Sequence, residues 1–474
     1  MEIDPIEFSP EKDARYDGHF YRAILTTGIF CRPICPSRPA RAENMLFFTT
    51  AAAAAEAGFR PCLRCRPESA PDRPEGVGVS RLVKQALRLI TQDVAGKDLA
   101  KRLYVSPRQL RRRFVQELGA PPSAIIQTRK LLFAKKLLDE TKLPMTDVAY
   151  CAGYTSVRRF NAAIRQTYNR TPTDIRNSRR KSWSTTDEST VQLNLFFRPP
   201  LNWTQLSRQL MDRANPQIEL VSDCTYKRLV RFGSDVGWFT ISPRLDQNHL
   251  LLTVSQEVTA HLLTITELCK RLFDLRTDPN FVMGHLSTDP LLVDRYRQHA
   301  GLRIAGAWDE FETAVQIVLR HQTNQEASSK MTEALIGRCG QAIQFENQAY
   351  TLFPTPQQIL AADLKEIALP SHKLTAIRSL AAALLEGNLD WFTPDALPEI
   401  ITALTALPEI NEWMAHMIAL LCFTEINAFP ADDYQLREAV TPIGTPLLSP
   451  AALMQHAIEW EPFRGYAAHL LWKE

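Results

Sequence analysis

A chain of 474 residues is long enough to form three domains, and its hydrophobic content of 45% is ordinary for a globular protein. No apolar run reaches the length that crosses a bilayer, so no membrane-spanning segment is expected. The net charge of +3 hides a division along the chain, because residues 81–181 carry 23 basic and 7 acidic residues, whereas residues 182–474 carry 22 and 34. The basic segment is typical of a protein that binds nucleic acid.

Four cysteines near the N-terminus form two short-spaced pairs, Cys31-Arg-Pro-Ile-Cys35 and Cys62-Leu-Arg-Cys65. This spacing predicts a tetrahedral site in which four thiolates hold one Zn²⁺, and a purely structural zinc knuckle stays an alternative. The chain has no signal peptide, which indicates a cytosolic protein and disfavours disulfides. The remaining cysteines are expected to be small core residues: Cys151, Cys224, Cys269, Cys339 and Cys422.

Three segments around these cysteines read Thr26-Thr-Gly-Ile-Phe-Cys31-Arg-Pro-Ile-Cys35, Arg41-Ala-Glu-Asn44 and Gly58-Phe-Arg-Pro-Cys62-Leu-Arg-Cys65-Arg-Pro67. They closely resemble the N-terminal domain of the Ada-type adaptive-response protein. The resemblance implies that Cys31 takes a methyl group from a methylphosphotriester in the DNA backbone. It also implies that Thr27, Arg38 and Arg60 contact phosphate. Arginines flank the four sulfurs, namely Arg32, Arg38, Arg41, Arg60, Arg64 and Arg66.

The charge of such a site explains why a methylated phosphate would be its substrate. Zinc-bound sulfurs stay thiolates at neutral pH, so four of them leave the site with a net negative charge that repels phosphate. A methylphosphotriester is uncharged and approaches without that repulsion. Because Cys31 loses its negative charge on methylation, we expect tighter DNA binding afterwards. One transfer per molecule would make the site both a stoichiometric repair centre and a sensor.

The basic segment begins with a Pro/Glu/Gly linker at residues 67–78 and a predicted helix at 79–90. Residues 98–114 have the chemistry of a helix-turn-helix, because Ser106 can cap the second helix and Pro107 suits its first position. That second helix offers polar donors suited to a DNA groove, namely Arg108, Gln109, Arg111, Arg112 and Arg113.

A long helix is predicted at residues 122–140, followed by a second helix-turn-helix at 145–165 with Gly153 at its turn and Ser156 as cap. The long helix is expected to point three lysines outward, Lys130, Lys135 and Lys136. Together with residues 169–176, the region resembles the AraC-type DNA-binding domain. Two such units on one chain can enter successive major grooves without dimerisation. The candidate contacts, to bases or to phosphates, are Arg108, Gln109, Arg112, Thr155 and Arg158.

Residues 182–189 are a polar linker, after which alternating segments at 191–197 and 250–254 predict strands. Residues 191 to about 280 are therefore interpreted as a small α/β piece. From residue 307 onward the pattern is almost wholly helical, beginning with an amphipathic helix at 308–322.

The segments Leu407-Pro-Glu-Ile-Asn-Glu-Trp-Met-Ala-His-Met-Ile-Ala-Leu420 and Phe429-Pro-Ala-Asp-Asp-Tyr434 resemble the helix-hairpin-helix and following aspartate of DNA glycosylases. With residues 272–275 and 460–467, the resemblance is to the AlkA-type 3-methyladenine DNA glycosylase over residues 191–474. It implies that Asp433 is catalytic and that Trp413 and Trp472 line the base pocket. Asp432 is expected to cap the next helix, and the alternative is that both aspartates only cap.

An alkylated, cationic purine leaves without a general acid, so a carboxylate need only stabilise the sugar cation and orient water. The chain departs from the family pattern at the hairpin, where Glu409 and Asn411 stand at glycine positions that receive a DNA phosphate. Residues 320–322 also replace a Gly-Gln-Leu segment that wedges into the duplex. These departures predict weaker duplex affinity, a narrower substrate range or loss of glycosylase activity.

We therefore expect a multidomain, mainly α protein. Its predicted parts are a small α/β zinc domain with four cysteine ligands at 1–76, an all-α AraC-type double helix-turn-helix domain at 77–182, and an α+β helix-hairpin-helix glycosylase with subdomains at 191–290 and 291–474. The expected cofactor is one Zn²⁺, and the expected partners are promoter DNA, alkylated double-stranded DNA and RNA polymerase. The protein is expected to be a cytoplasmic monomer. Two alternatives stay open: a regulator whose glycosylase-like domain only senses damage, and a repair enzyme whose helix-turn-helix region only adds affinity.

Overall fold

The computed structural model describes residues 13–72, 79–92, 94, 96–178, 189–364, 367–393 and 395–472. Two linkers are expected, at 67–78 and 182–189. Their residues 73–78 and 182–188 lie outside the described residues. The chain divides into two compact units. The N-terminal unit comprises Met1–Pro199, Leu229–Lys270 and Leu275–Asp278, and the C-terminal unit comprises Pro200–Arg228, Arg271–Asp274 and Pro279–Glu474. Among the described helices, none combines the length and apolar character needed to cross a membrane.

The first part of the N-terminal unit is a small sheet that brings the cysteines together. Its strands follow the order β3-β1-β2-β4, with bounds β1 Tyr21–Ile24, β2 Ile29–Cys31, β3 Met45–Phe48 and β4 Arg60–Pro61. β2 and β4 are parallel, and Phe30 pairs with Pro61, so Cys31 and Cys62 follow neighbouring positions of adjacent strands. Helix α1 (Ala51–Glu56) begins after Thr50, whose side chain accepts the Ala53 N–H. The expected small α/β domain is confirmed.

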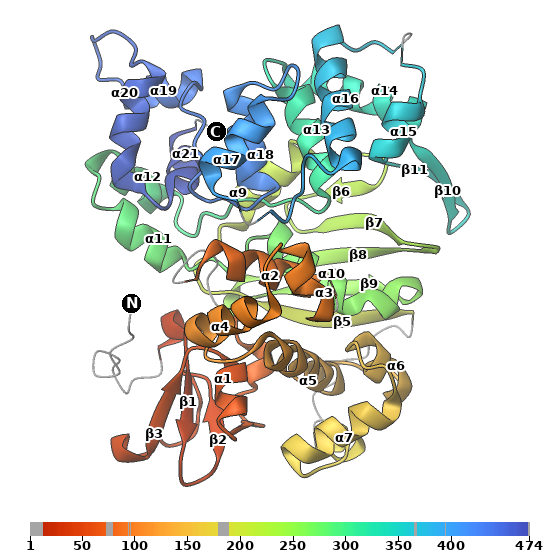
Figure 1. Ribbon diagram of the computed structural model, residues 1–474, viewed down its shortest axis with the longest axis vertical. Helices are drawn as coiled ribbons and strands as arrows, with labels where there is room; N and C mark the ends of the chain where they lie inside the picture. Colours follow the sequence, from red (N-terminus) through yellow and green to blue (C-terminus); the bar gives the residue numbers. More distant parts are fainter. Residues whose placement is uncertain are drawn as a thin grey trace. The chain divides into compact units, whose positions relative to one another are not determined.

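Among its described residues, the basic segment forms helices and no strand, as predicted. They are α2 Arg81–Thr91, α3 Gly96–Arg102, α4 Pro107–Leu118, α5 Pro122–Glu140, α6 Met145–Cys151, α7 Val157–Tyr168 and α8 Pro172–Asn177. Ser106 and Ser156 cap α4 and α7 by accepting the N–H groups of Gln109 and Arg159. Gly153 has a φ of +79°, which suits the turn between α6 and α7. Helix α5 lies between α4 on one side and α6 and α7 on the other (Figure 1).

The expectation that α5 points its lysines outward is wrong for two of the three. Lys135 and Lys136 are buried, because α5 packs against α1, against the 3₁₀ turn Pro67–Ser69 and against strand β5 (Thr190–Phe196). Lys130 is half-buried, and its ammonium donates to the Gly153 carbonyl at 2.6 Å. The basic face of α5 is therefore an internal surface, which helical periodicity alone could not reveal.

These lysines belong to a buried cluster of three cations and three anions that we name the α5 charge cluster: Arg66, Glu68, Lys135, Lys136, Asp139 and Glu140. The Lys135 ammonium lies 2.6 Å from Asp139 and 3.2 Å from Glu68, and Arg66 lies 2.7 Å from Glu140. Arg66 directly follows the cysteine pair of the zinc segment. The cluster therefore ties the loop that carries Cys65 to the helix that joins the two helix-turn-helix units.

The remainder of the chain adds a five-stranded antiparallel sheet in the order β5-β9-β8-β7-β6. The further strands are β6 Glu219–Val221, β7 Tyr226–Phe232, β8 Asp235–Arg244 and β9 His249–Ser255. In β5 buried and half-buried residues alternate, and Leu193 pairs with Leu252 of β9. Cys224 is exposed in the turn between β6 and β7, so its expected place in the core is wrong, whereas the other four single cysteines are buried.

Among the described residues from 279 onward, the chain is helical except for one hairpin that the sequence did not predict. β10 (Gln341–Phe345) and β11 (Gln348–Leu352) are joined by Glu346 and Asn347, both at positive φ, as a two-residue hairpin turn requires. The helices of this half of the chain are α9 Trp203–Met211, α10 Leu262–Leu272, α11 Pro279–Leu286, α12 Pro290–Gln298, α13 Glu310–Arg320, α14 Gln325–Cys339, α15 Pro356–Ala361, α16 Ser371–Glu386, α17 Leu397–Thr405, α18 Glu412–Leu421, α19 Tyr434–Val440, α20 Pro450–His456 and α21 Arg464–Leu471.

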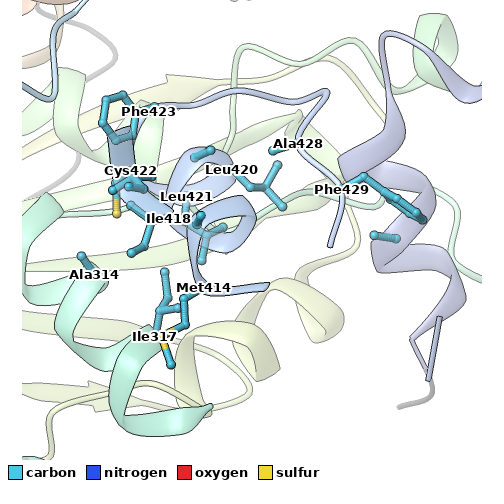
Figure 2. Close-up of a cluster of buried hydrophobic side chains, with 14 of the residues drawn as sticks. Ala314, Ile317, Met414, Ile418, Leu420, Leu421, Cys422, Phe423, Ala428 and Phe429 are labelled. Carbon is cyan, nitrogen blue, oxygen red and sulfur yellow. The ribbon is translucent and has the colours of Figure 1, made fainter. Parts of the chain in front are cut away.

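One apolar core holds the helices of the C-terminal unit together. Figure 2 shows Ile317 of α13 beside Met414 of α18, and Ile418 and Leu421 continue the buried face of α18. Helix α17 packs on α18 as the partner of the predicted hairpin. The mainly helical, multidomain fold class is thereby confirmed.

We expect Lys135→Met to destabilise the protein by about 1.5–3 kcal/mol, because Asp139 and Glu68 would keep Arg66 but lose the hydrogen-bonded Lys135 ammonium. A lower midpoint of urea unfolding would report this loss. Lys142→Met removes an exposed lysine just beyond the same helix and serves as the matched control. Equal midpoints for the two variants would contradict a stabilising role of the α5 charge cluster.

Candidate functional site

The four sulfurs of Cys31, Cys35, Cys62 and Cys65 lie within 4.8 Å of one another. Tetrahedral Zn–S bonds of about 2.3 Å place sulfurs about 3.8 Å apart, so the arrangement fits one Zn²⁺. Two backbone N–H groups also donate to sulfur, from Arg32 to Cys65 and from Arg64 to Cys62, each at 3.3 Å. Such donors stabilise thiolate rather than thiol. The predicted four-cysteine zinc site is confirmed as a geometry that suits this ion.

The four ligands differ in access to solvent. Cys35, Cys62 and Cys65 are only 5%, 8% and 7% exposed, whereas Cys31 is half-buried. An attacking sulfur must reach a carbon atom outside the protein, so Cys31 is the ligand best placed to react. Its assignment as methyl acceptor stays a prediction.

The flanking arginines divide into internal and external groups. Arg32 is buried and forms an ion pair with Asp17, and its guanidinium also donates to the Cys65 carbonyl at 3.2 Å. Arg66 belongs to the α5 charge cluster. These two arginines position the zinc loops rather than facing a ligand. The predicted phosphate contacts are more accessible, with Thr27 and Arg38 exposed and Arg60 half-buried.

The predicted DNA-reading residues all lie at the surface of the helix-turn-helix units. Arg108, Gln109 and Arg112 are exposed on α4, in the first turns after its cap. Arg158 is exposed on α7, and exposed Thr155 precedes its cap and accepts a hydrogen bond from Arg159 at 3.2 Å. Both sets begin at helix N-termini, as in helices that enter a major groove.

The C-terminal unit contains a pocket that brings together the three residues predicted for glycosylase chemistry. Asp433, Trp413 and Trp472 all line it, although they come from the start of α19, from α18 and from the segment after α21. Met417, Tyr434 and His469 are further lining residues. Two indoles and a carboxylate around one cavity suit an aromatic base and its sugar.

Both carboxylate oxygens of Asp433 are engaged. Oδ1 accepts the Leu436 N–H at 3.0 Å, so Asp433 is the N-cap of α19, and Oδ2 accepts the Trp413 indole N–H at 2.8 Å. The expectation that Asp432 caps this helix is wrong, because α19 begins at Tyr434 and the preceding residue takes the cap position. Asp432 Oδ1 is instead buried without a hydrogen-bond partner, and burial raises the pKa of Asp432.

The hairpin before α18 adopts a backbone conformation that suits glycine, although Glu409 and Asn411 stand at the glycine positions of the family. Glu409 has a φ of +65°, the left-handed conformation that favours glycine, and is exposed. Asn411 caps α18 by accepting the Met414 N–H at 2.9 Å. Further along α18, His416 Nδ1 accepts the Phe429 N–H at 3.2 Å, and burial lowers the pKa of His416 to about 4.

Sequence reasoning missed Lys373, and it placed His321 in the altered wedge segment without relating it to this pocket. Lys373 is buried and donates to the carbonyls of Val318, Leu319 and His321, which are the free groups at the end of α13. The ring of His321 lies against that of Trp413, with centroids 5.2 Å apart. A single lysine within the apolar helix α16 was the only signal for Lys373, and nothing in the sequence related His321 to Trp413.

Three family models match the chain in consecutive segments. They are the metal binding domain of Ada over residues 8–68, a helix-turn-helix domain over residues 99–178, and the AlkA N-terminal domain over residues 192–309. This order of domains defines a DNA-binding protein with a metal-binding module and a glycosylase-type module on one chain.

Whole-chain similarity identifies the family. A probable bifunctional transcriptional activator/DNA repair enzyme AlkA of Mycobacterium tuberculosis (strain ATCC 25618 / H37Rv) is 36% identical, over 97% of this chain and 94% of the relative. DNA-3-methyladenine glycosylase 2 of Escherichia coli (strain K12) is 30% identical, over 59% of this chain and 95% of the relative. The solved 3-methyladenine DNA-glycosylase from Archaeoglobus fulgidus has a TM-score of 0.50 at 18% identity, covers 59% of this chain and 96% of its own, and shows a shared fold. The chain belongs to the family of bifunctional transcriptional activators and DNA repair enzymes.

We expect the purified protein to hold one zinc per chain and Cys65→Ser to lose most of it, because an incomplete thiolate set binds Zn²⁺ more weakly. Elemental analysis after gel filtration measures this ratio. Cys151→Ser changes a buried cysteine outside the cluster and should keep the full zinc content. Equal zinc in both variants would contradict the four-ligand site.

Proposed function

We propose that the protein repairs alkylated DNA by two reactions and uses the first of them to control transcription. The observation that carries the proposal is the combination of two reactive groups on one chain. One is a solvent-accessible Cys31 in a four-thiolate site, and the other is Asp433, held by the Trp413 indole in a pocket that Trp472 also lines. The proposed domains are 1–76 for methyl transfer, 77–182 for DNA reading, and 191–290 with 291–474 for base excision.

In the first reaction, Cys31 Sγ attacks the methyl carbon of a DNA methylphosphotriester. A carbon–sulfur bond forms as the carbon–oxygen bond breaks, and the electron pair leaves with the phosphate oxygen, so no proton transfer is needed. Zn²⁺, when bound, keeps the four sulfurs as thiolates. Thr27, Arg38 and Arg60 are proposed to hold the phosphate next to Cys31. The thioether product has no route back to thiolate, so each chain reacts once.

Loss of one negative charge at the zinc site then favours binding to the negatively charged DNA backbone. Arg108, Gln109, Arg112, Thr155 and Arg158 are proposed to contact the operator, with the two recognition helices in successive grooves. We infer that the methylated protein activates transcription as a monomer in contact with RNA polymerase.

We expect wild-type protein to gain one methyl group from methylphosphotriester DNA and then to bind its promoter more tightly, by about tenfold, which equals about 1.4 kcal/mol. Intact-mass spectrometry reports the transfer, and binding titrations at fixed salt report the affinity. Cys31→Ser should neither accept the group nor gain affinity. Methylation of this variant at another cysteine would refute the assignment of Cys31.

In the second reaction, Asp433 stabilises the cationic sugar as an alkylated base departs and orients the attacking water. We propose 3-methyladenine as a substrate, which makes the domain a DNA-3-methyladenine glycosylase II without lyase chemistry. Each Asp433 oxygen already receives one N–H, so the carboxylate is held in place with lone pairs to spare. Trp413 and Trp472 are proposed to stack on the extruded base, whose positive charge favours aromatic faces.

We expect Asp433→Asn to lower release of 3-methyladenine from methylated DNA by a factor on the order of 100 or more, because the amide cannot stabilise positive charge. Chromatography of released bases measures the rate. Asp432→Asn is the neighbouring control and should retain much more activity. Undiminished release by Asp433→Asn would rule out its catalytic role.

A second candidate function is a damage-sensing regulator whose glycosylase-like domain binds DNA with weak or absent catalysis. The observation that favours it is the placement of exposed Glu409 and Glu412 on both sides of the α18 cap, where negative charge repels phosphate. Base release by wild type distinguishes the two functions. Methylation of Cys31 without any base release would support the sensor.

A further inference from the structure

Two residues at which the chain departs from the glycosylase pattern are bonded to each other. His321 directly follows α13, and Asn411 caps α18. The Asn411 Nδ2 and His321 Nε2 atoms are 3.0 Å apart, although the two residues are separated by 90 positions in the sequence. The residue that departs from the family pattern in the wedge segment therefore contacts the one that departs from it in the hairpin.

The hydrogen-bond pattern determines which group donates. Asn411 Oδ1 accepts the Met414 N–H at 2.9 Å, which orients the amide so that its Nδ2 faces His321. Nδ2 can only donate, so His321 Nε2 must accept. The imidazole is therefore neutral and carries its proton on Nδ1.

This imidazole connects to the proposed catalytic carboxylate through one side chain. Its ring lies against the Trp413 indole at 5.2 Å and an interplanar angle of 43°. The Trp413 N–H in turn donates to Asp433 Oδ2 at 2.8 Å. On its other side, the His321 carbonyl accepts a 2.7 Å hydrogen bond from the buried Lys373 ammonium.

We propose that His321 is a positioning residue for Asp433, which in its neutral form holds the indole of Trp413 in the orientation that fixes the carboxylate. The proposal rests on the glycosylase function proposed above. Protonation of Nε2 would place an N–H against the Asn411 NH₂ group, so the bridge would break and the indole would lose one support. Base excision should therefore depend on the protonation state of a group that does not line the pocket itself.

The surroundings of His321 keep it neutral near neutral pH. Burial lowers the pKa of His321 below its ordinary value of 6.5, and Lys373 and His372 of α16 lower it further. The other charged neighbours along these segments are Arg320, which lies 3.8 Å from Asp212 of α9, and the exposed Glu409 and Glu412 of the hairpin. A lowered pKa means that the bridge is intact above about pH 6.5 and is lost as pH falls through the folded-state pKa.

Three variants of the full-length protein test the role. His321→Gln keeps an acceptor for Asn411 but cannot titrate, His321→Ala has neither property, and His456→Gln changes an exposed histidine on α20 as the control. Release of 3-methyladenine is measured between about pH 5 and pH 8 to give kcat and KM for each protein.

We expect His321→Ala to lower kcat about tenfold at neutral pH with a smaller change in KM, because substrate contacts remain while the carboxylate is less well held. His321→Gln should restore most of kcat and flatten the decline of kcat toward low pH. His456→Gln should retain the wild-type profile. Equal losses in the Ala and Gln variants, or an unchanged acid decline in His321→Gln, would overturn the proposal.

A second measurement does not depend on activity. Nitrogen-15 NMR of histidine-labelled protein should show His321 as the Nδ1–H tautomer, and Asn411→Gly should shift its Nε2 resonance. An active wild type with His321 in the Nε2–H form would overturn this inference alone. A wild type that releases no base would overturn the glycosylase function and the inference with it. Thermal unfolding of each variant confirms that it is folded.

Discussion

The mutual repulsion of four sulfurs within 4.8 Å is the constraint on which the N-terminal unit depends. As thiolates they require a divalent cation at their centre, so the fold of this segment and its charge are set together. The pairing of β2 with β4 brings the two cysteine pairs to one place, and Arg32 is committed to Asp17 and to the Cys65 carbonyl. The charge of Arg32 is therefore used to build the site, whereas Arg38 stays exposed at the surface.

The α5 charge cluster extends this constraint to the DNA-binding helices. Arg66 follows the last ligand, has a φ of +56°, and pairs with Asp139 and Glu140 of α5. Three cations and three anions compensate one another, so the contact is neutral as a whole, yet each member depends on its partners. A change in the position of the Cys65 loop would therefore move ion-pair partners of α5, the helix that joins both helix-turn-helix units. The cluster physically connects the four-cysteine segment to the helix-turn-helix region within one unit.

Local chemistry made part of this structure predictable. The Ser106 and Ser156 caps, the bounds of α5 and the cysteine cluster follow from patterns within a few residues. Features set by tertiary packing did not follow. The same periodicity that located α5 assigned Lys135 and Lys136 to solvent, because it cannot tell which polar face another segment will cover. Asp433 rather than Asp432 caps α19, because the helix starts one residue later than the sequence predicted. The contact between His321 and Asn411 joins positions with no shared local pattern.

The N-terminus of α18 is poorly suited to holding a DNA phosphate. Asn411 occupies the Met414 N–H, and Glu412 lies in the first turn, where negative charge stabilises the helix dipole. One N–H group that could attract a phosphate is therefore already satisfied by the protein itself, and a negative charge stands beside it. An acidic glycosylase module with such a hairpin gains DNA from the basic segment at 81–181, to which it is covalently joined, because tethering raises the local concentration of duplex. The charge division along the sequence thus fits the altered hairpin, because a basic segment that binds DNA can compensate for an acidic module that holds it weakly.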